Sequence, residues 1–150
     1  MKKIFSTLFI ISLLSCSYSQ VNSNAIGLRG GSGNLGYGGE ITFQKGIGEG
    51  NRLELDFGAR GYGNGSELIA SGIYHWVKNI TSGLNWYIGP GAQVGIGNGF
   101  RLGVGGQIGI EFDLNEVDIP LLISIDSRPM FGFGGSGFRA GAFGALRYTF

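Results

Sequence analysis

The sequence predicts an all-β fold, a single antiparallel up-and-down β-barrel of about eight strands. Apolar and polar residues alternate over long stretches, and short turns rich in glycine and asparagine separate these stretches. No segment carries a helical apolar stripe longer than a turn or two. The 150 residues suit one domain, and 31 glycines without a Gly-X-Y repeat exclude collagen.

The first residues predict an export signal rather than a part of the fold. Lys2 and Lys3 precede an apolar run at residues 4–14, and small residues at Ser17 and Ser19 suit cleavage before Gln20. We therefore expect residues 1–19 to be a cleaved signal peptide and residues 20–150 to form the barrel. The alternative is a lipoprotein signal, in which Cys16 of "LLSC" is lipidated and retained.

Eight strands are expected in order at residues 24–31, 35–45, 51–61, 66–77, 83–96, 99–113, 118–131 and 138–149. The turns between them are too short for parallel crossovers, so neighbouring strands should pair as antiparallel hairpins. The sixth stretch alternates most clearly, with apolar residues at Phe100, Leu102, Val104, Ile108, Ile110 and Phe112. The phase of the fourth stretch stays open, because its large apolar residues do not separate onto two faces.

Glycine placement indicates which face of the strands lies inside. Six glycines of the fifth and sixth strands share the polar face: Gly89, Gly91, Gly95, Gly103, Gly105 and Gly109. Glycine weakens a strand, and a solvent-exposed face gains nothing from it. The interior of an eight-stranded barrel is narrow, so small residues there make room for a few long ones. The polar face should therefore point inward and the apolar face outward, toward lipid.

The charged residues of this polar face are nearly balanced, and all the basic ones are arginines. The planar guanidinium group suits paired, partly buried ion networks. We therefore expect an ion network inside the barrel, formed by Arg29, Glu40, Arg52, Glu54, Asp56, Arg60, Arg101, Glu111, Asp113, Asp126, Arg128, Arg139 and Arg147.

Strand length and aromatic residues indicate a transmembrane barrel. Strands of ~10–13 residues, tilted by ~40°, cross the apolar slab of a bilayer. Trp76, Trp86 and Tyr87 flank one turn, and Tyr148 lies near the chain end. Interfacial girdles are built from such aromatic residues. We expect the membrane girdle to include Trp76, Trp86 and Tyr148.

The chain ends with "ALRYTF", which places Leu146, Tyr148 and Phe150 on one face. This ending resembles the C-terminal assembly signal of bacterial outer-membrane β-barrels. Residues 24–150 resemble small eight-stranded barrels of the OmpX and OmpA-transmembrane kind. They look most like the glycine-rich outer-membrane β-barrels common in Bacteroidetes, through "YIGPGAQVGIG", "LGVGGQIGIEF" and "IPLLISIDSRPMF". The resemblance implies an outer-membrane location, contacts with outer-membrane lipid and with the barrel-assembly machinery, and no catalytic signature.

Composition gives no sign of a cofactor. A net charge of +1 gives no reason to expect nucleic acid, and the chain has no cluster of cysteine and histidine for a transition metal. Asp113, Glu116 and Asp118 could hold calcium, although a solvated acidic turn explains them as well. We expect a monomer that is not an enzyme, with a structural, envelope-integrity or interaction role.

Two alternatives remain. The first is a secreted soluble β-barrel that binds a small apolar ligand inside, with an interior lined by Leu102, Val104, Ile108 and Ile110. The second is a lipid-modifying enzyme of the outer membrane that uses the sole histidine, His75, with Ser71 and Glu67. If both termini are periplasmic, His75 lies near the wrong rim for lipid of the outer leaflet.

Overall fold

The computed structural model describes residues 24–150, except 35, 64 and 134–136. The expected signal peptide and the alternative at Cys16 lie outside these residues. The strands are β1 (Asn24–Gly33), β2 (Gly36–Gly46), β3 (Asn51–Tyr62), β4 (Gly65–Thr81), β5 (Leu84–Gly97), β6 (Gly99–Asp113), β7 (Leu121–Ser127), β8 (Met130–Gly132), β9 (Gly137–Arg139) and β10 (Gly141–Thr149), with a short 3-10 helix η1 (Leu114–Val117) after β6. In the described part of the chain, no helix is long and apolar enough to span a membrane.

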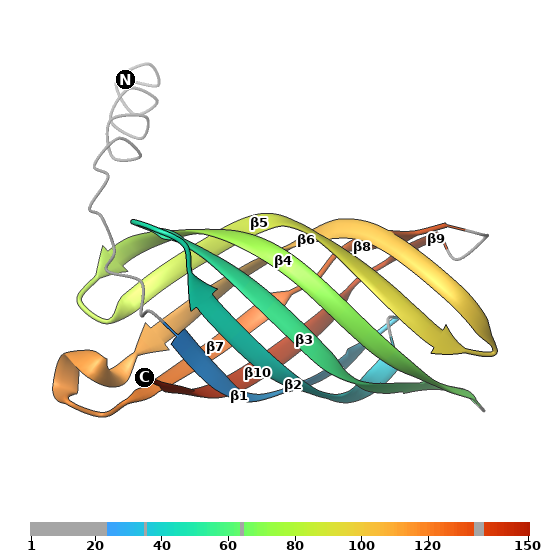
Figure 1. The fold of residues 1–150 in the computed structure, drawn as a ribbon, viewed down its shortest axis with the longest axis horizontal. Coiled ribbons are helices and arrows are strands. Elements are labelled where there is room, and N and C mark those ends of the chain that lie inside the picture. Colours follow the sequence, from blue (N-terminus) through green and yellow to red (C-terminus); the bar gives the residue numbers. More distant parts are fainter. Residues whose placement is uncertain (1–23, 35, 64, 134–136) are drawn as a thin grey trace, which may run out of the picture.

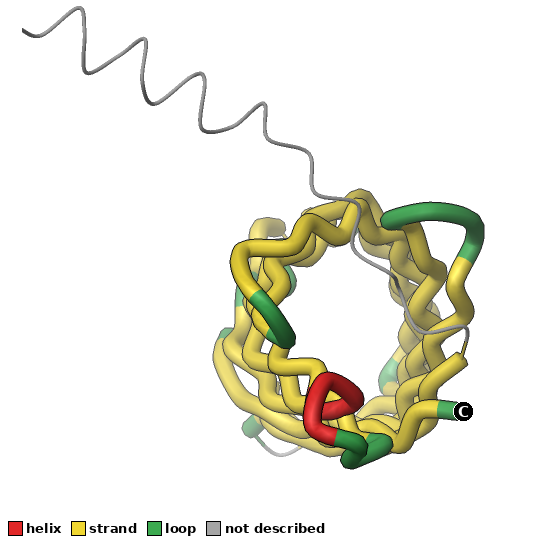
Figure 2. The backbone as a smooth tube through the Cα atoms, turned by 90° about the vertical axis from the view of Figure 1, so that its left-hand side faces the viewer, coloured by secondary structure: helices red, strands yellow, loops and turns green. Residues whose placement is uncertain are grey.

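The strands form one closed antiparallel barrel (Figure 1). β1 to β7 pair in chain order, and the pairing of β1 with β10 joins the first and last strands. β7 and β8 both pair with β6, so together they occupy one position in the wall. β9 and β10 likewise share the next position. The barrel therefore has eight strands, seen end-on as a ring in Figure 2, which confirms the predicted fold class.

The seventh and eighth strands differ from their predicted ranges. The expected strand 118–131 begins only at Leu121, because η1 and the left-handed backbone of Asp118 (φ 60°) form the turn before it. It is also interrupted at Arg128 and Pro129, and proline has no N–H to donate to a ladder. The Arg128 N–H bonds the Gly141 carbonyl, and the Pro129 carbonyl accepts from Gly106. A second interruption, at Ala140, divides the predicted strand 138–149.

The register sets the tilt of the strands. A row of cross-strand partners that starts at Ile110 on β6 passes once around the barrel and returns to β6 at Phe100, ten residues away. In an eight-stranded barrel this offset corresponds to a tilt of about 40°. Rows of side chains on the outer wall therefore run obliquely around it.

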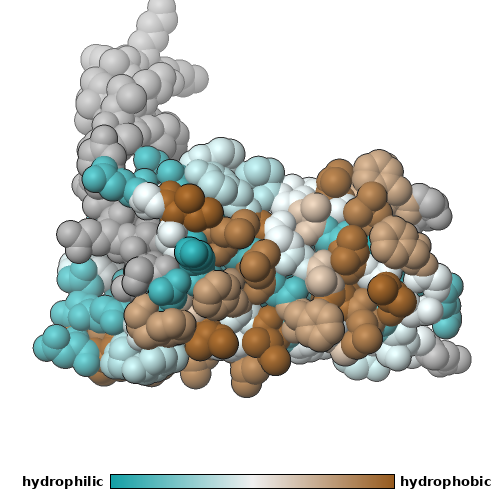
Figure 3. Space-filling model, viewed as in Figure 1, coloured by the Kyte–Doolittle hydropathy of each residue, from teal (hydrophilic) through white to brown (hydrophobic). Residues whose placement is uncertain are grey.

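Burial alternates along the strands with the predicted phase. On β6 the apolar side chains are exposed, from 41% at Leu102 to 69% at Phe100, whereas Gln107 and Glu111 are buried. In β4 the structure assigns the phase left open by the sequence: Ile69, Ile73 and His75 face inward. On the face seen in Figure 3, apolar residues cover much of the wall, and polar residues gather at the end where β1 begins and β10 ends.

The meander places its connections at two ends. The start of β1 and the end of β10 lie at one end, called the terminal end below, with the β2–β3 and β4–β5 turns and with η1. The β1–β2, β3–β4, β5–β6 and β8–β9 connections lie at the opposite end, called the distal end below. Trp76 and Tyr148 are about half exposed on the outer wall, toward the terminal end. Tyr87, which flanks the same turn as Trp76 and Trp86, is fully buried inside the barrel.

Candidate functional site

The interior of the barrel holds the main concentration of charged groups among the described residues. Ten of the predicted network residues lie there, each no more than 4% exposed: Arg29, Glu40, Arg52, Glu54, Asp56, Arg60, Glu111, Asp126, Arg128 and Arg147. They face inward because each occupies the buried phase of its strand. Five are arginines and five are carboxylates, so the charges within this group can balance.

Arg128 connects the largest number of strands. Its Nη2 contacts Asp56 and lies 3.2 Å from Glu54 Oε1, while Nη1 lies 3.3 Å from Glu40 Oε2. The same guanidinium group donates to Gln107 Oε1 and to Ser71 Oγ. One side chain thus links the interruption between β7 and β8 to β2, β3, β4 and β6.

Arg29 and Arg60 share the Glu40 carboxylate. Arg29 Nη1 lies 3.2 Å from Oε2, and Arg60 Nε donates to Oε1 at 3.0 Å. Arg29 also pairs with Asp126. Phe143, the apolar residue on the polar face of the last strand, packs against these groups, with its ring centre 4.0 Å from Arg29 Cζ and 5.0 Å from Arg60 Cζ. An aromatic face attracts a guanidinium group, so Phe143 belongs to the charged cluster.

Glu54 is the acceptor at the centre of the site. Arg147 Nη2 lies 2.8 Å from its Oε2, and Gln44 donates to the same oxygen at 2.6 Å. Gln107 donates to Oε1 at 3.1 Å. Arg147 is held in turn by Thr42 and Ser124, whose hydroxyl oxygens accept from it at 3.1 and 2.8 Å.

A smaller group lies toward the terminal end. Arg52 pairs with Glu111 at 2.6 Å and donates from Nε to His75 Nδ1 at 3.3 Å. The Tyr87 ring centre lies 4.7 Å from Arg52 Cζ and 4.6 Å from the centre of the His75 ring. His75 is fully buried, and its Nε2 has no hydrogen-bond partner among the described residues.

Three predicted network residues lie apart from these groups. Arg101 is at the distal end, 32% exposed, and pairs with Glu67 at 3.2 Å. Arg139 lines a small cavity of about 30 Å³ there, together with Arg101 and Glu67. Asp113 caps η1, because its Oδ1 accepts from the Asn115 N–H at 3.0 Å.

Several partners in the interior were not part of the predicted ion network. Glu67, His75 and Ser71 were named as candidate catalytic residues, and Gln107 was not assigned to the network. The alternation of β6 was an available signal for Gln107, whereas β4, whose phase the sequence left open, gave none for the other three. Within the described ranges, no group of three or more histidine, cysteine, aspartate or glutamate residues is arranged to hold a metal ion.

Fixed charges packed in this way can fill space and hold the wall together. An arginine paired with a carboxylate in a low-dielectric interior is costly to break, since removal of one partner leaves the other charge buried alone. The wall is thereby cross-linked from inside, by contacts between strands that are distant in the chain.

Comparison with known proteins supports the fold. No protein-family model matches the chain, and no curated protein matches it in sequence. Among solved structures, Neisserial surface protein A (NspA) has a similar structure, with a TM-score of 0.63 and 14% sequence identity. The match covers 85% of this chain and 95% of that chain. At this identity the likeness shows a shared fold.

Proposed function

We propose that this protein is an integral outer-membrane β-barrel with a filled polar interior and a structural, envelope-integrity or interaction role. The observation that carries the proposal is the inverted distribution of side chains. Four of the largest fully buried side chains are arginines, while large apolar side chains cover the outside. A water-soluble barrel buries its apolar face, whereas a transmembrane barrel exposes that face to lipid.

Aromatic residues near both ends of the outer wall support membrane insertion. Trp76, Trp86 and Tyr148 face outward toward the terminal end, and Phe100 and Phe138 face outward at the distal end. Such belts mark the two interfaces of a bilayer, where aromatic rings contact both lipid and headgroups. NspA, which shares the fold, is an outer-membrane barrel.

The filled interior argues against a wide pore. In a barrel of eight strands the lumen is just wide enough for side chains to fill it. Here Arg128, Arg147 and Glu54 link opposite walls across it. We therefore propose a role that depends on the outer wall and the ends, with no catalytic step and no cofactor.

Export by a cleaved signal peptide and insertion by the barrel-assembly machinery complete the proposal. Leu146, Tyr148 and Phe150 are each more than half exposed on one outer face of the last strand and its end. This leaves their side chains accessible to an assembly factor.

The two alternatives receive less support. The hypothesis of a secreted soluble barrel requires four apolar residues inside, but all four lie on the outer wall and are 41–48% exposed: Leu102, Val104, Ile108 and Ile110. The hypothesis of a lipid-modifying enzyme requires His75 and Ser71 to lie within reach of lipid. Both face the interior, where Arg52 donates to His75 and Arg128 donates to Ser71.

Cell fractionation followed by gel electrophoresis of unheated and heated samples tests the proposal. A barrel closed by hydrogen bonds along its whole circumference resists detergent until it is heated. We expect recovery in the outer membrane and a heat-dependent change in mobility. Recovery in the soluble periplasmic or secreted fraction would overturn the membrane assignment. If expression of the wild type altered the lipid profile and expression of His75→Ala did not, the hypothesis of a lipid-modifying enzyme would be supported instead.

A further inference from the structure

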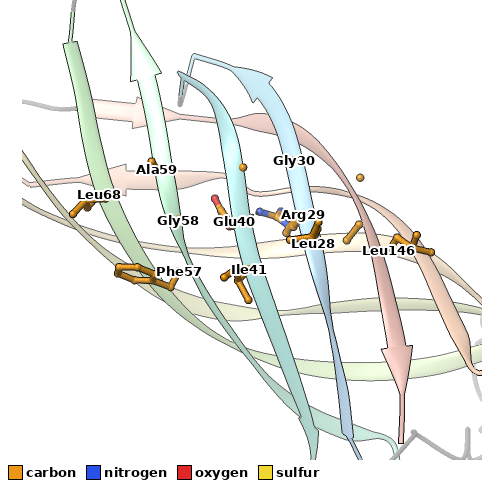
Figure 4. Close-up of a pocket in the computed structure, with 13 residues that line it drawn as sticks. Leu28, Arg29, Gly30, Glu40, Ile41, Phe57, Gly58, Ala59, Leu68 and Leu146 are labelled. Atoms are coloured by element: carbon orange, nitrogen blue, oxygen red, sulfur yellow. Dashed lines mark hydrogen bonds and ion pairs between the residues drawn. The ribbon is translucent and has the colours of Figure 1, made fainter.

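The outer wall carries a groove of about 840 Å³ across β10, β1, β2 and β3. One side is an apolar ridge made of side chains from four adjacent strands (Figure 4): Leu146, Leu28, Ile41 and Phe57. The floor is the neighbouring row of cross-strand partners, Gly144, Gly30, Gly39 and Ala59, and Leu68 continues this row. The groove therefore follows one oblique row of the barrel.

Packing of the barrel does not require the glycines of this floor. A Cβ atom at Gly30 would come no closer than 3.4 Å to another atom, and at Gly39 and Gly144 no closer than 3.8 Å. The inward-facing Gly38 and Gly58 differ, because a Cβ there would lie 2.1 Å from a carbonyl oxygen of the next strand. Interior glycines relieve crowding, whereas the floor glycines leave an open groove on the outside.

The groove offers no accessible charge. Arg29 and Glu40 lie beneath the floor with side chains 0% and 1% exposed, directed into the interior and paired with each other. The floor residues belong to paired strands, so their backbone groups are engaged in the ladder. An occupant must therefore be apolar and uncharged where it touches the groove.

The dimensions favour a narrow occupant. Ridge and floor are two residues apart along each strand, which is about 7 Å. An α-helix is about 10–12 Å across with its side chains, which is wider than this spacing. A stable contact between two copies takes about 20–30 residues a side, more than the 13 that line this groove. A single hydrocarbon chain, whose atoms pack at about 3.5–4.0 Å, can lie on the floor against the ridge.

We propose that this groove binds one acyl chain of a membrane phospholipid, in a fixed position on the β10–β1–β2–β3 wall. The inference rests on the proposed membrane location, which brings acyl chains to this surface. It goes further, because the remaining outer wall needs only a fluid layer of lipid, whereas this groove retains an individual molecule.

The test fills the groove and asks whether the barrel still retains lipid. Gly30→Val/Gly39→Val covers the centre of the floor, and Gly30→Ala/Gly39→Ala fills it partly. The matched control is Gly72→Val on β4, where a new Cβ would meet only Leu55 Cδ2 at 3.6 Å and which lies outside the groove. Each full mature barrel is loaded with phosphatidylethanolamine in micelles and examined by native mass spectrometry. Heat-dependent mobility verifies that each variant has folded.

We expect wild type and Gly72→Val to retain one lipid, and the valine variant to retain about tenfold less. This is the loss expected when about two methylene groups lose their contact. The alanine variant should be intermediate, and free fatty acid should displace the lipid. Equal lipid retention by all folded variants would overturn the proposed acyl-chain site but not the proposed function. Displacement of the lipid by glycerophosphoethanolamine, which has no acyl chain, would do the same. If the wild type forms a dimer that the valine variant does not form, the groove binds a second copy of the chain rather than lipid. If the barrel does not enter membranes in cells, the proposed function itself is wrong.

Discussion

Arg128 shows how a single side chain contributes to this interior. It leaves the wall where the seventh strand is interrupted and contacts three carboxylates, those of Glu40, Glu54 and Asp56. A lysine at this position could not satisfy them in the same way, because its charge is concentrated at one nitrogen, whereas the guanidinium group is a planar fork with five donors. The interruption beside Pro129 thus coincides with the residue that connects the most strands.

Replacement of Arg128 by methionine should be costly. Methionine preserves much of the side-chain length, but Glu54 and Asp56 lose a buried partner, and we expect the free energy of unfolding to fall by about 3–5 kcal/mol. The control is Arg101→Met, which removes a partly exposed pair with Glu67 and should cost about 0–1 kcal/mol. Urea unfolding in phospholipid vesicles, followed by tryptophan fluorescence, measures both. Equal losses of unfolding free energy in the two variants would show that Arg128 does not stabilise the buried carboxylates as proposed.

Alternating burial in the strands explains why most of the wall was predictable. On β6 every large apolar residue faces outward, so a period of two defines both the strand and its phase. On β4 the inward face mixes Ile69, Ile73 and Val77 with Glu67, Ser71 and His75. Both faces then carry large apolar residues, and no rule of alternation separates them.

The pairings inside the barrel could not be predicted in the same way. The alternation of polar and apolar residues along the strands places Arg128 and Glu40 on the inner face, but the two residues are 88 positions apart in the chain. Their contact depends on the tilt and register of the closed barrel, which one strand does not reveal. The same limit applies to Glu67, whose pairing with Arg101 depends on the height of both residues at the distal end. The role of Asp113 as a cap depends on the 3-10 helix after β6, which the alternation of the strand does not reveal.

Two neighbouring glycines of β2 should respond differently to alanine. Gly38 faces inward, where a Cβ would lie 2.1 Å from the Ala59 carbonyl oxygen. We expect Gly38→Ala to lower the free energy of unfolding by about 1–3 kcal/mol through overpacking. Gly39 faces outward with room for a Cβ, and alanine there should raise stability by about 0.4–1 kcal/mol by restricting the unfolded chain. The same unfolding assay compares the two, and a loss of equal size at Gly39 would contradict the assignment of inner and outer faces.

The end of β10 carries the predicted assembly signal. Phe150 is 61% exposed, and its ring stacks on that of Tyr148 at 6.4 Å between centres. Replacement of Phe150 by alanine should reduce the amount of protein inserted in cells but change little in refolding into detergent, because the side chain is exposed and the backbone N–H bond to the Asn24 carbonyl is kept. Quantification of outer-membrane protein against refolding yield separates the two effects, with Ile80→Ala, another exposed apolar position, as control. Equal insertion of the wild type and of Phe150→Ala would remove the assembly role.

At the scale of the whole molecule, interior and exterior have exchanged the roles that they have in a soluble protein. The interior is held by ion pairs and hydrogen bonds between side chains, and only Met130 and Phe143 form a buried hydrophobic cluster among the described residues. Burial of apolar surface from water cannot account for the stability of such a barrel. Hydrogen bonds of the closed ladder and lipid around the wall must do so, because open sheet edges are not tolerated in a bilayer.

Because the apolar face is on the outside, the cost of a charged substitution there should depend on its depth in the membrane. Ile108 lies in the middle of the outer face of β6 and Val117 in η1 at the terminal end, and both are exposed. In a bilayer, arginine costs about 2–4 kcal/mol near the midplane and about 0–1 kcal/mol near the interface. We therefore expect Ile108→Arg to destabilise the barrel in phospholipid vesicles much more than Val117→Arg. In water both positions would accept arginine equally, so matching small effects in urea unfolding would place this surface in solvent rather than in lipid.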